Sequence, residues 1–266
     1  MSPHAAPLGG QLDTVIRFER VQKTFGTQQV FRDLSLEIQR GEIIALVGSS
    51  GCGKSVLLKL ILGLLKVDSG SVHVDGEDIT RYSEQKLLPI RRKVGMVFQN
   101  GALFDSLSVF DNIAYPLRER GVDSGQALPA RVAEVLEMVG LPGIERKMPA
   151  ELSGGMRKRV SLARAVAEVP QVILYDEPTT GLDPVNTRRI SELIVELRDK
   201  LDTTSIVVTH DLASAYMITD RMAMVGEGRI IAVDSTIRFR RNTDPSVREF
   251  LTAMNLRPRS EDPPPP

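Results

Sequence analysis

Hydrophobic and polar residues alternate along three short segments in the first third of the chain. These segments are residues 15–21, 34–38 and 71–75. Successive side chains of a strand point to opposite faces, so the alternation indicates strands with one buried and one solvent-exposed face. We therefore predict an antiparallel sheet in this part of the chain.

Continuous apolar runs at 43–47, 172–175 and 205–208 have a different meaning. A strand that is apolar on both faces is typical of a buried parallel sheet, and residues 93–98 are predicted to add a further strand. Strand, helix and strand at the spacing of the last two runs predict a parallel crossover. The residues that fall on one face of the intervening helix are Ile190, Leu193, Ile194, Leu197 and Leu201.

The remaining pattern completes an α/β fold. From about residue 100 to 166 the periodicity is helical, and residues 222–233 predict a hairpin. We predict one domain over residues 14–240, with the helical subdomain inserted at about 100–166. Residues 1–13 are expected to form a disordered arm, and residues 241–266 a C-terminal extension with a disordered, proline-rich end.

Composition narrows the possible functions. The 266 residues include 34 Lys and Arg against 34 Asp and Glu, which gives no overall positive field and argues against nucleic acid as a partner. Cys52 is the only cysteine, so no intrachain disulfide is possible and we expect a reducing compartment. We find neither an apolar run long enough to span a bilayer nor a signal-peptide pattern. We therefore expect a soluble chain that can still dock on a membrane protein.

The segment Gly48–Ser55 matches the phosphate-binding pattern GxxxxGK[ST] and directly follows the apolar run 43–47. We expect Lys54 to bridge the β- and γ-phosphates of a nucleotide and Ser55 to ligate Mg²⁺. The alternative is a chance glycine-rich turn. The residues expected to bind the nucleotide here are Gly48, Ser49, Ser50, Gly51, Cys52, Gly53, Lys54, Ser55 and Val56.

Two carboxylates follow the apolar run 172–175. In a nucleotide-hydrolysing site, Asp176 can hold Mg²⁺ through its water shell, and Glu177 can polarise the attacking water. The alternative is a pair of solvated acids at a strand end.

A second anion site is predicted at residues 153–155. Ser153 can cap the helix that follows, while Gly154 and Gly155 leave backbone N–H groups accessible at the positive end of that helix.

These motifs together resemble those of an ATP-binding cassette (ABC) ATPase. In the family's order, they are similar to a Walker A loop at 48–55, the Q-loop glutamine Gln99, the signature motif at 152–156, Walker B at 172–177, the D-loop at 181–183 and the H-loop histidine His210. The resemblance implies a P-loop NTPase with a parallel-sheet RecA-like core, an antiparallel β subdomain and a helical signature subdomain. ATP and Mg²⁺ are the implied cofactors.

The resemblance also implies roles for individual residues. Gln99 would sense the γ-phosphate, contact Mg²⁺ together with Ser55 and Asp176, and couple the site to a transmembrane partner. His210 would contact the γ-phosphate, and Phe25 would stack on adenine. A structural histidine and an ordinary core phenylalanine are the alternatives. The implied catalytic set is Glu177, His210, Gln99 and Lys54.

The family resemblance further implies a head-to-tail homodimer. In such a dimer, Ser153, Gly154 and Gly155 of one subunit would close on the ATP bound to the phosphate loop of the other.

Three features resemble the ATPase of Mla/Mce-type phospholipid transporters. They are Met156, which stands where most family members carry glutamine, the segment 98–119, and the segment 244–251. This resemblance implies a multi-span permease, a periplasmic MCE lipid-binding protein, a possible STAS-domain protein, and a location on the cytoplasmic face of the inner membrane.

The resemblance also implies a groove that receives a helix of the permease, formed by Ala102, Leu103, Phe104, Leu107, Val109 and Phe110. The alternative functions are the ATPase of a small-solute importer and a non-transport ABC switch in cell division.

Overall fold

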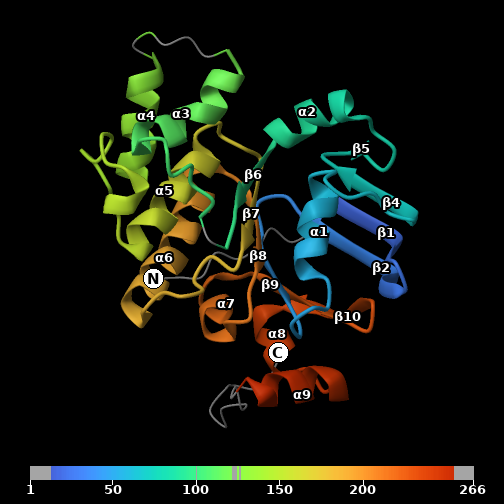
Figure 1. Ribbon diagram of the computed structural model, residues 1–266. Helices are drawn as coiled ribbons and strands as arrows, with labels where there is room; N and C mark the ends of the chain where they lie inside the picture. The colour runs from blue at the N-terminus through green and yellow to red at the C-terminus, as the bar shows by residue number, and fades with distance from the viewer. Residues whose placement is uncertain (1–12, 100, 122–124, 126, 255–266) are drawn as a thin grey trace.

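The computed structural model describes residues 13–99, 101–121, 125 and 127–254. The expected N-terminal arm, apart from residue 13, and the proline-rich end lie outside these residues. Two sheets and the helices around them form the described part of the chain (Figure 1).

The six-stranded sheet has the order β10-β9-β3-β8-β7-β6. Its strands β3, β6, β7, β8 and β9 run parallel to their neighbours, while β10 pairs antiparallel with β9 in the predicted hairpin. The apolar runs thus form a parallel sheet as predicted. The strands are β3 (Ile43–Val47), β6 (Val94–Val97), β7 (Val172–Asp176), β8 (Thr204–Val208), β9 (Arg221–Gly226) and β10 (Arg229–Ser235).

The four-stranded sheet is antiparallel, with the order β2-β1-β4-β5. The alternating segments predicted it, although the first two strands continue past the predicted ends because they pair with each other along most of their length. The strands are β1 (Thr14–Phe25), β2 (Gln28–Gln39), β4 (Ser69–Val74) and β5 (Glu77–Asp78).

Helix α1 packs on one face of the six-stranded sheet and α5, α6 and α7 on the other, with α3 and α4 packed against α5 (Figure 1). Residues 101–108 are not helical, which differs from the helical pattern predicted from about residue 100. The helices are α1 (Lys54–Ile61), α2 (Glu84–Arg92), α3 (Val109–Glu119), α4 (Ala127–Met138), α5 (Gly154–Val166), α6 (Pro184–Leu201), α7 (Leu212–Ile218), α8 (Thr236–Arg240) and α9 (Pro245–Ala253), with a 3₁₀ turn at Pro149–Glu151.

Strand β3 separates the hydrophobic cores. Ile44 and Leu46 belong to the cluster shared with the antiparallel sheet and α1, while Ile43 belongs to the cluster under α3, α4, α5 and α6. Ala45 and Val47 pack against α7 and α9. Because every residue of β3 is buried, the loop that follows it starts from a fixed position.

A buried asparagine fixes the non-helical segment before α3. Asn112 is fully buried, and its Oδ1 accepts a hydrogen bond from the N–H of Phe104 at 2.8 Å. Its Nδ2 lies 3.0–3.1 Å from the carbonyl oxygens of Phe104, Leu107 and Ser108. One side chain therefore replaces the backbone hydrogen bonds that a helix or strand would provide.

We expect Asn112→Ala to lower the free energy of unfolding by roughly 1–3 kcal/mol, because buried backbone groups lose their partner. Urea denaturation followed by circular dichroism measures the change. Arg188→Ala is the matched control, since Arg188 is exposed and only pairs with Glu192 on the surface. Equal unfolding midpoints for the two variants would refute the role of Asn112.

Candidate functional site

The phosphate loop lies between β3 and α1, at the carboxyl edge of the parallel sheet. At two of its glycines, both the positive φ angle and the close approach of neighbouring atoms exclude a side chain. Gly48 has φ 145°, and a Cβ there would lie 2.3 Å from the carbonyl oxygen of Val225. Gly53 has φ 105°, and a Cβ there would lie 2.7 Å from the ring of Phe31. No other residue type fits either position without displacing its neighbours.

A cavity of about 620 Å³ opens over this loop. The ends of β3, β7 and β8 converge on it, which is where open α/β sheets bind ligands. It brings together most of the residues predicted for the site. Its lining consists of Gly48, Ser50, Gly51, Gly53, Lys54, Ser55, Val56, Gln99, Asp176, Glu177, Val208, His210 and Met254.

Lys54 is a buried cation at the floor of this cavity. It is 8% exposed, and its Nζ donates to the carbonyl oxygens of Gly48 at 2.8 Å and Ser49 at 3.0 Å. Within the described part of the chain, no carboxylate forms an ion pair with it. A buried charge that has only neutral partners is costly, so this position favours an anionic ligand.

Ser55 and Asp176 form a second element of the cavity. The Ser55 hydroxyl donates to Oδ1 of Asp176 at 3.0 Å. Burial raises the pKa of Asp176, and the hydrogen bond from Ser55 opposes this effect. A hydroxyl, a carboxylate and the amide of Gln99 in one cavity are hard oxygen donors that fit Mg²⁺. Among the described residues, no group of three or more His, Cys, Asp and Glu side chains is arranged to hold a metal ion.

Glu177 is held in an unusual conformation. Its φ is 51°, in the left-handed region that a non-glycine residue occupies at a cost of about 1–3 kcal/mol. Its N–H donates to the carbonyl oxygen of Val208 at 2.9 Å. Its Oε2 lies 2.8 Å from Nδ1 of His210 and accepts from the Thr180 hydroxyl at 3.1 Å. The carboxylate of Glu177 therefore contacts His210 within the lining of the cavity.

The predicted second anion site does not line this cavity. Ser153 caps α5 by accepting from the N–H of Met156 at 3.3 Å, and both Ser153 and Gly154 are exposed. Gly155 packs against α6, where a Cβ would lie 2.7 Å from Oδ1 of Asn186. The N-terminus of α5 is therefore formed and accessible, but it belongs to a different surface from the cavity of its own chain.

Three other predicted residues also lie outside the cavity lining. Phe25 is 42% exposed at the end of β1, with the ammonium of Lys23 5.2 Å from the centre of its ring. Ser49 and Cys52 belong to the phosphate loop, and Sγ of Cys52 lies 3.9 Å from Nζ of Lys54. The structure thus places Phe25 where a ring can be approached from solvent.

Sequence reasoning missed three residues at or beside the cavity. Val208 and Met254 line it, and no sequence signal points to Met254 at the end of α9. Lys158 of α5 is 7% exposed, and its Nζ donates to the carbonyl oxygen of Gln99. Burial lowers the pKa of Lys158, while Glu177 and Asp176 oppose this shift. Its spacing from Gly155 and Leu162 places it on the buried face of α5, which was the available signal.

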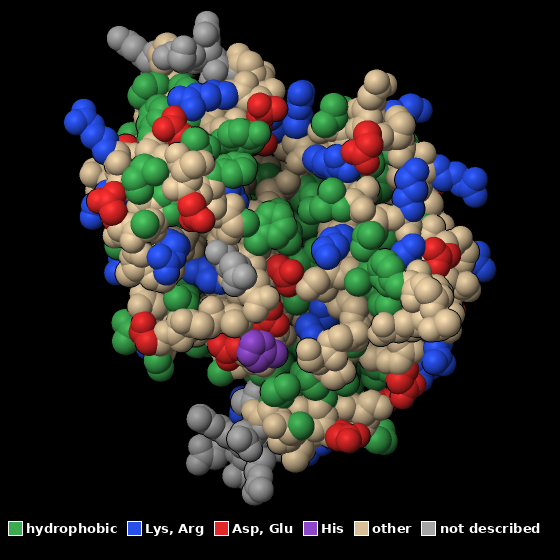
Figure 2. All heavy atoms as spheres, viewed as in Figure 1, with side chains coloured by type: hydrophobic (Ala, Val, Ile, Leu, Met, Phe, Trp, Pro, Cys, Tyr) green, Lys and Arg blue, Asp and Glu red, His purple; other side chains and the backbone are tan. Residues whose placement is uncertain are grey.

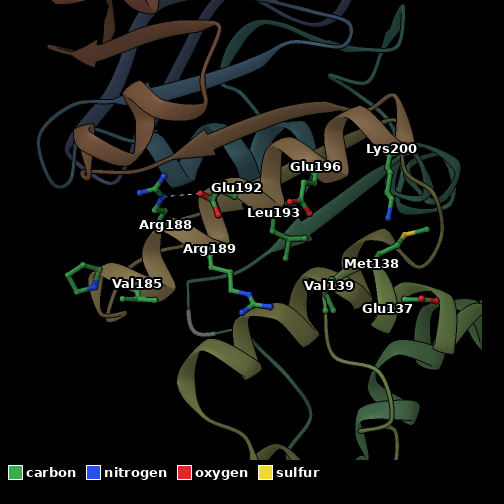
Figure 3. Close-up of a pocket in the computed structure, with 12 residues that line it drawn as sticks. Glu137, Met138, Val139, Val185, Arg188, Arg189, Glu192, Leu193, Glu196 and Lys200 are labelled. Atoms are coloured by element: carbon green, nitrogen blue, oxygen red, sulfur yellow. Dashed lines mark hydrogen bonds and ion pairs between the residues drawn. The ribbon is translucent and has the colours of Figure 1, made fainter. Parts of the chain in front are cut away.

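A second hollow, of about 840 Å³, lies between the end of α4 and α6 (Figure 3). Met138 and Val139 face Leu193 across it, and Arg188 pairs with Glu192 at 2.9 Å. None of the residues predicted for the nucleotide site lines this hollow.

Comparisons with known proteins agree with the geometry of the cavity. Residues 31–180 match the family model described as ABC transporter. The chain is 40% identical to the probable ribonucleotide transport ATP-binding protein mkl of Mycobacterium leprae, over 95% of this chain and 74% of that protein. It is 42% identical to the intermembrane phospholipid transport system ATP-binding protein MlaF of Escherichia coli K12, over 88% of this chain and 87% of that protein.

The solved structures that resemble this chain include ATP-binding cassettes. A dimeric ATP-binding cassette in a post-hydrolysis state, bound to ADP and phosphate, has a TM-score of 0.76 and 32% sequence identity, and the match covers 83% of this chain and 98% of that one. A search of the described helices finds none with the length and hydropathy needed to cross a membrane. On its motifs, its fold and these matches, the chain belongs to the ABC transporter family and is an ATPase of that family.

Proposed function

We propose that this chain is the ATP-hydrolysing subunit of a membrane transporter that moves phospholipids between the inner and outer membranes. The observation that carries the proposal is the cavity in which Lys54, Ser55, Asp176 and Glu177 converge at the carboxyl edge of the sheet. The named function of the Escherichia coli relative supports the phospholipid substrate. The resemblance of segments 98–119 and 244–251 to the Mla/Mce-type ATPases points the same way.

The residues of the cavity have separate roles in ATP hydrolysis. Lys54 exchanges its present carbonyl partners for the β- and γ-phosphate oxygens of ATP. Ser55, Asp176 and Gln99 hold Mg²⁺, which neutralises phosphate charge when bound. The other residues of the phosphate loop, including Ser49 and Cys52, surround the phosphates together with Val56 of α1, and Phe25 stacks on adenine.

Glu177 acts as the base in this scheme. Its carboxylate accepts a proton from the attacking water, and the strained backbone keeps it at the end of β7. His210, 2.8 Å from that carboxylate, orients it and contacts the γ-phosphate.

The active form is a homodimer. Each cavity lacks a second set of backbone donors, whereas the N-terminus of α5 offers such donors on another surface. A head-to-tail pair supplies Ser153, Gly154 and Gly155 of one subunit to the ATP of the other. Because one missing donor at a developing charge can cost about 10²–10³ in rate, a lone subunit hydrolyses ATP poorly.

A permease docks on the apolar surface that follows Gln99. Phe104 and Tyr115 are both 44% exposed, with ring centres 5.0 Å apart, and the guanidinium of Arg164 lies 5.9 Å from the ring of Phe104. Hydrophobic side chains gather in the middle of the face in Figure 2, between the helices at the left and the strands at the right.

The exposed residues Ala102 and Phe104, with the half-buried Leu103, Leu107 and Phe110, provide this surface. Val109 does not belong to it, because it is fully buried.

The remaining partners follow from the phospholipid proposal. A multi-span permease places the subunit on the cytoplasmic face of the inner membrane, a periplasmic MCE protein carries the lipid, and a STAS-domain protein is a further candidate. If the chain served a small-solute importer, its partner would instead be a soluble binding protein. If it served as a cell-division switch, no lipid carrier would be among its partners.

Replacing Glu177 with Gln should lower ATP turnover at least 100-fold and change ATP affinity less than about threefold, because binding needs no base. Phosphate release and binding of a fluorescent ATP analogue measure the two quantities. Glu196→Gln removes the same charge from an exposed position of α6 and should behave as the unchanged chain. Full turnover in Glu177→Gln would remove Glu177 from its role.

Phe104→Glu should reduce the permease that co-purifies with the tagged chain from membranes about tenfold or more, because a charge would be buried in an apolar contact. Mass spectrometry identifies the partners and the bound phospholipid, and ATP binding should be retained. Ile237→Glu, at a 71% exposed residue of α8, is the control. Recovery of no membrane protein and no phospholipid with the unchanged chain would contradict the proposed function.

A further inference from the structure

Helix α5 holds the segment after Gln99 with donors spaced three residues apart. Ser161 Oγ donates to the carbonyl oxygen of Gly101 at 2.8 Å. Arg164 donates from Nη1 to Ala102 at 2.8 Å and from Nη2 to Gly101 at 3.2 Å. These side chains follow Lys158 by one and two helical turns, so one stripe of α5 binds successive carbonyl groups of this segment.

Lys158 differs from the other two donors because it contacts two loops of the cavity. Its Nζ donates to the carbonyl oxygen of Gln99 and lies 3.4 Å from the carbonyl oxygen of Glu177. Both hydrogen-bond partners are backbone atoms, so these hydrogen bonds fix where the two residues lie, in addition to the electrostatic attraction between Lys158 and the carboxylates of Glu177 and Asp176. The carbonyl of Glu177 belongs to the residue with the strained φ, which makes its position dependent on such contacts.

The same helix begins with the predicted second anion site. Ser153 caps α5, and Lys158 follows five residues later, about 7 Å along the helix axis. A short helix of this kind moves as a rigid body, because its backbone hydrogen bonds and buried face hold it together. A displacement of its N-terminus is therefore transmitted to Lys158.

We propose that Lys158 is a positioning residue that couples the N-terminus of α5, offered to the nucleotide of a second subunit, to Gln99 and Glu177 of its own chain. This inference rests on the proposed function, since it requires ATP and the homodimer. No hydrogen bond of the described structure joins Lys158 to residues 48–55, so we expect its removal to leave ATP binding by a single subunit intact. ATP bound against Gln99 then no longer draws α5 into the position that the second subunit needs.

The experiment compares Lys158→Met, Lys158→Arg and Arg159→Met in the full-length chain. Arg159 is the matched control, because it is the next residue of α5 and donates to the carbonyl oxygens of Val139 and Gly140, away from the cavity. Five quantities are measured: affinity for a fluorescent ATP analogue, ATP-dependent dimerisation in the Glu177→Gln background by sedimentation, kcat and KM for ATP, and the midpoint of thermal unfolding.

For Lys158→Met we expect ATP-dependent dimerisation and kcat to fall about 10- to 100-fold, the equivalent of one lost hydrogen bond from a charged donor. ATP affinity and KM should stay within about twofold. Lys158→Arg should restore most of the loss, and Arg159→Met should change neither dimerisation nor kcat. A purely structural role would instead lower ATP affinity, dimerisation and thermal stability together.

Unchanged dimerisation and kcat in Lys158→Met, or equal losses in Arg159→Met, would overturn the coupling role while leaving the proposed function intact. Failure of the chain with Lys158 retained to dimerise on ATP in the Glu177→Gln background would overturn the proposed homodimer, and the coupling role with it.

Discussion

The structure depends on holding a buried ammonium group at the carboxyl edge of a parallel sheet. Lys54 donates to two backbone carbonyl oxygens and forms no ion pair with a carboxylate of the described residues, so its position favours an anionic ligand. The surrounding fold makes that arrangement possible. Strand β3 is buried along its whole length, and the glycines at 48 and 53 allow the loop to pass within contact distance of Val225 and Phe31. The fold thus supplies the rigidity that an uncompensated charge requires.

Most of the fold followed from periodicity, and the failures have physical causes. The runs that became β3, β7 and β8 were recognisable because they are buried on both faces. The segment 101–108 was predicted as helical, yet it is held in place by Asn112 and by donors from α5. Such a segment depends on hydrogen bonds to side chains that are distant in sequence, which local periodicity does not report. Helix α2 was not predicted, and it contains Pro89, a residue type that normally signals the end of a helix.

The residues of the candidate site could be predicted where a short sequence motif contains them. The phosphate loop and the acids Asp176 and Glu177 were found from local sequence, His210 was implied by the family resemblance, and residues of all three line one cavity. Lys158 and Met254 were not found, because each reaches the site from a helix whose own pattern is that of packing. The N-terminus of α5 was found, but it does not line the cavity of its own chain. A local motif gives the chemistry of a group, whereas only the fold shows which ligand it can reach.

Helix α5 connects three surfaces that the sequence presents separately. Its N-terminus is accessible, Lys158 contacts Gln99 and Glu177, and Arg164 lies near the exposed ring of Phe104. Phe104 is in turn fixed through its backbone by Asn112. A force on the apolar surface therefore acts on segments that share hydrogen bonds with the catalytic loops. Because packed elements of this kind shift between discrete arrangements rather than deform continuously, the proposed ATP site could convert a small change at the γ-phosphate into a rigid displacement of the proposed docking surface.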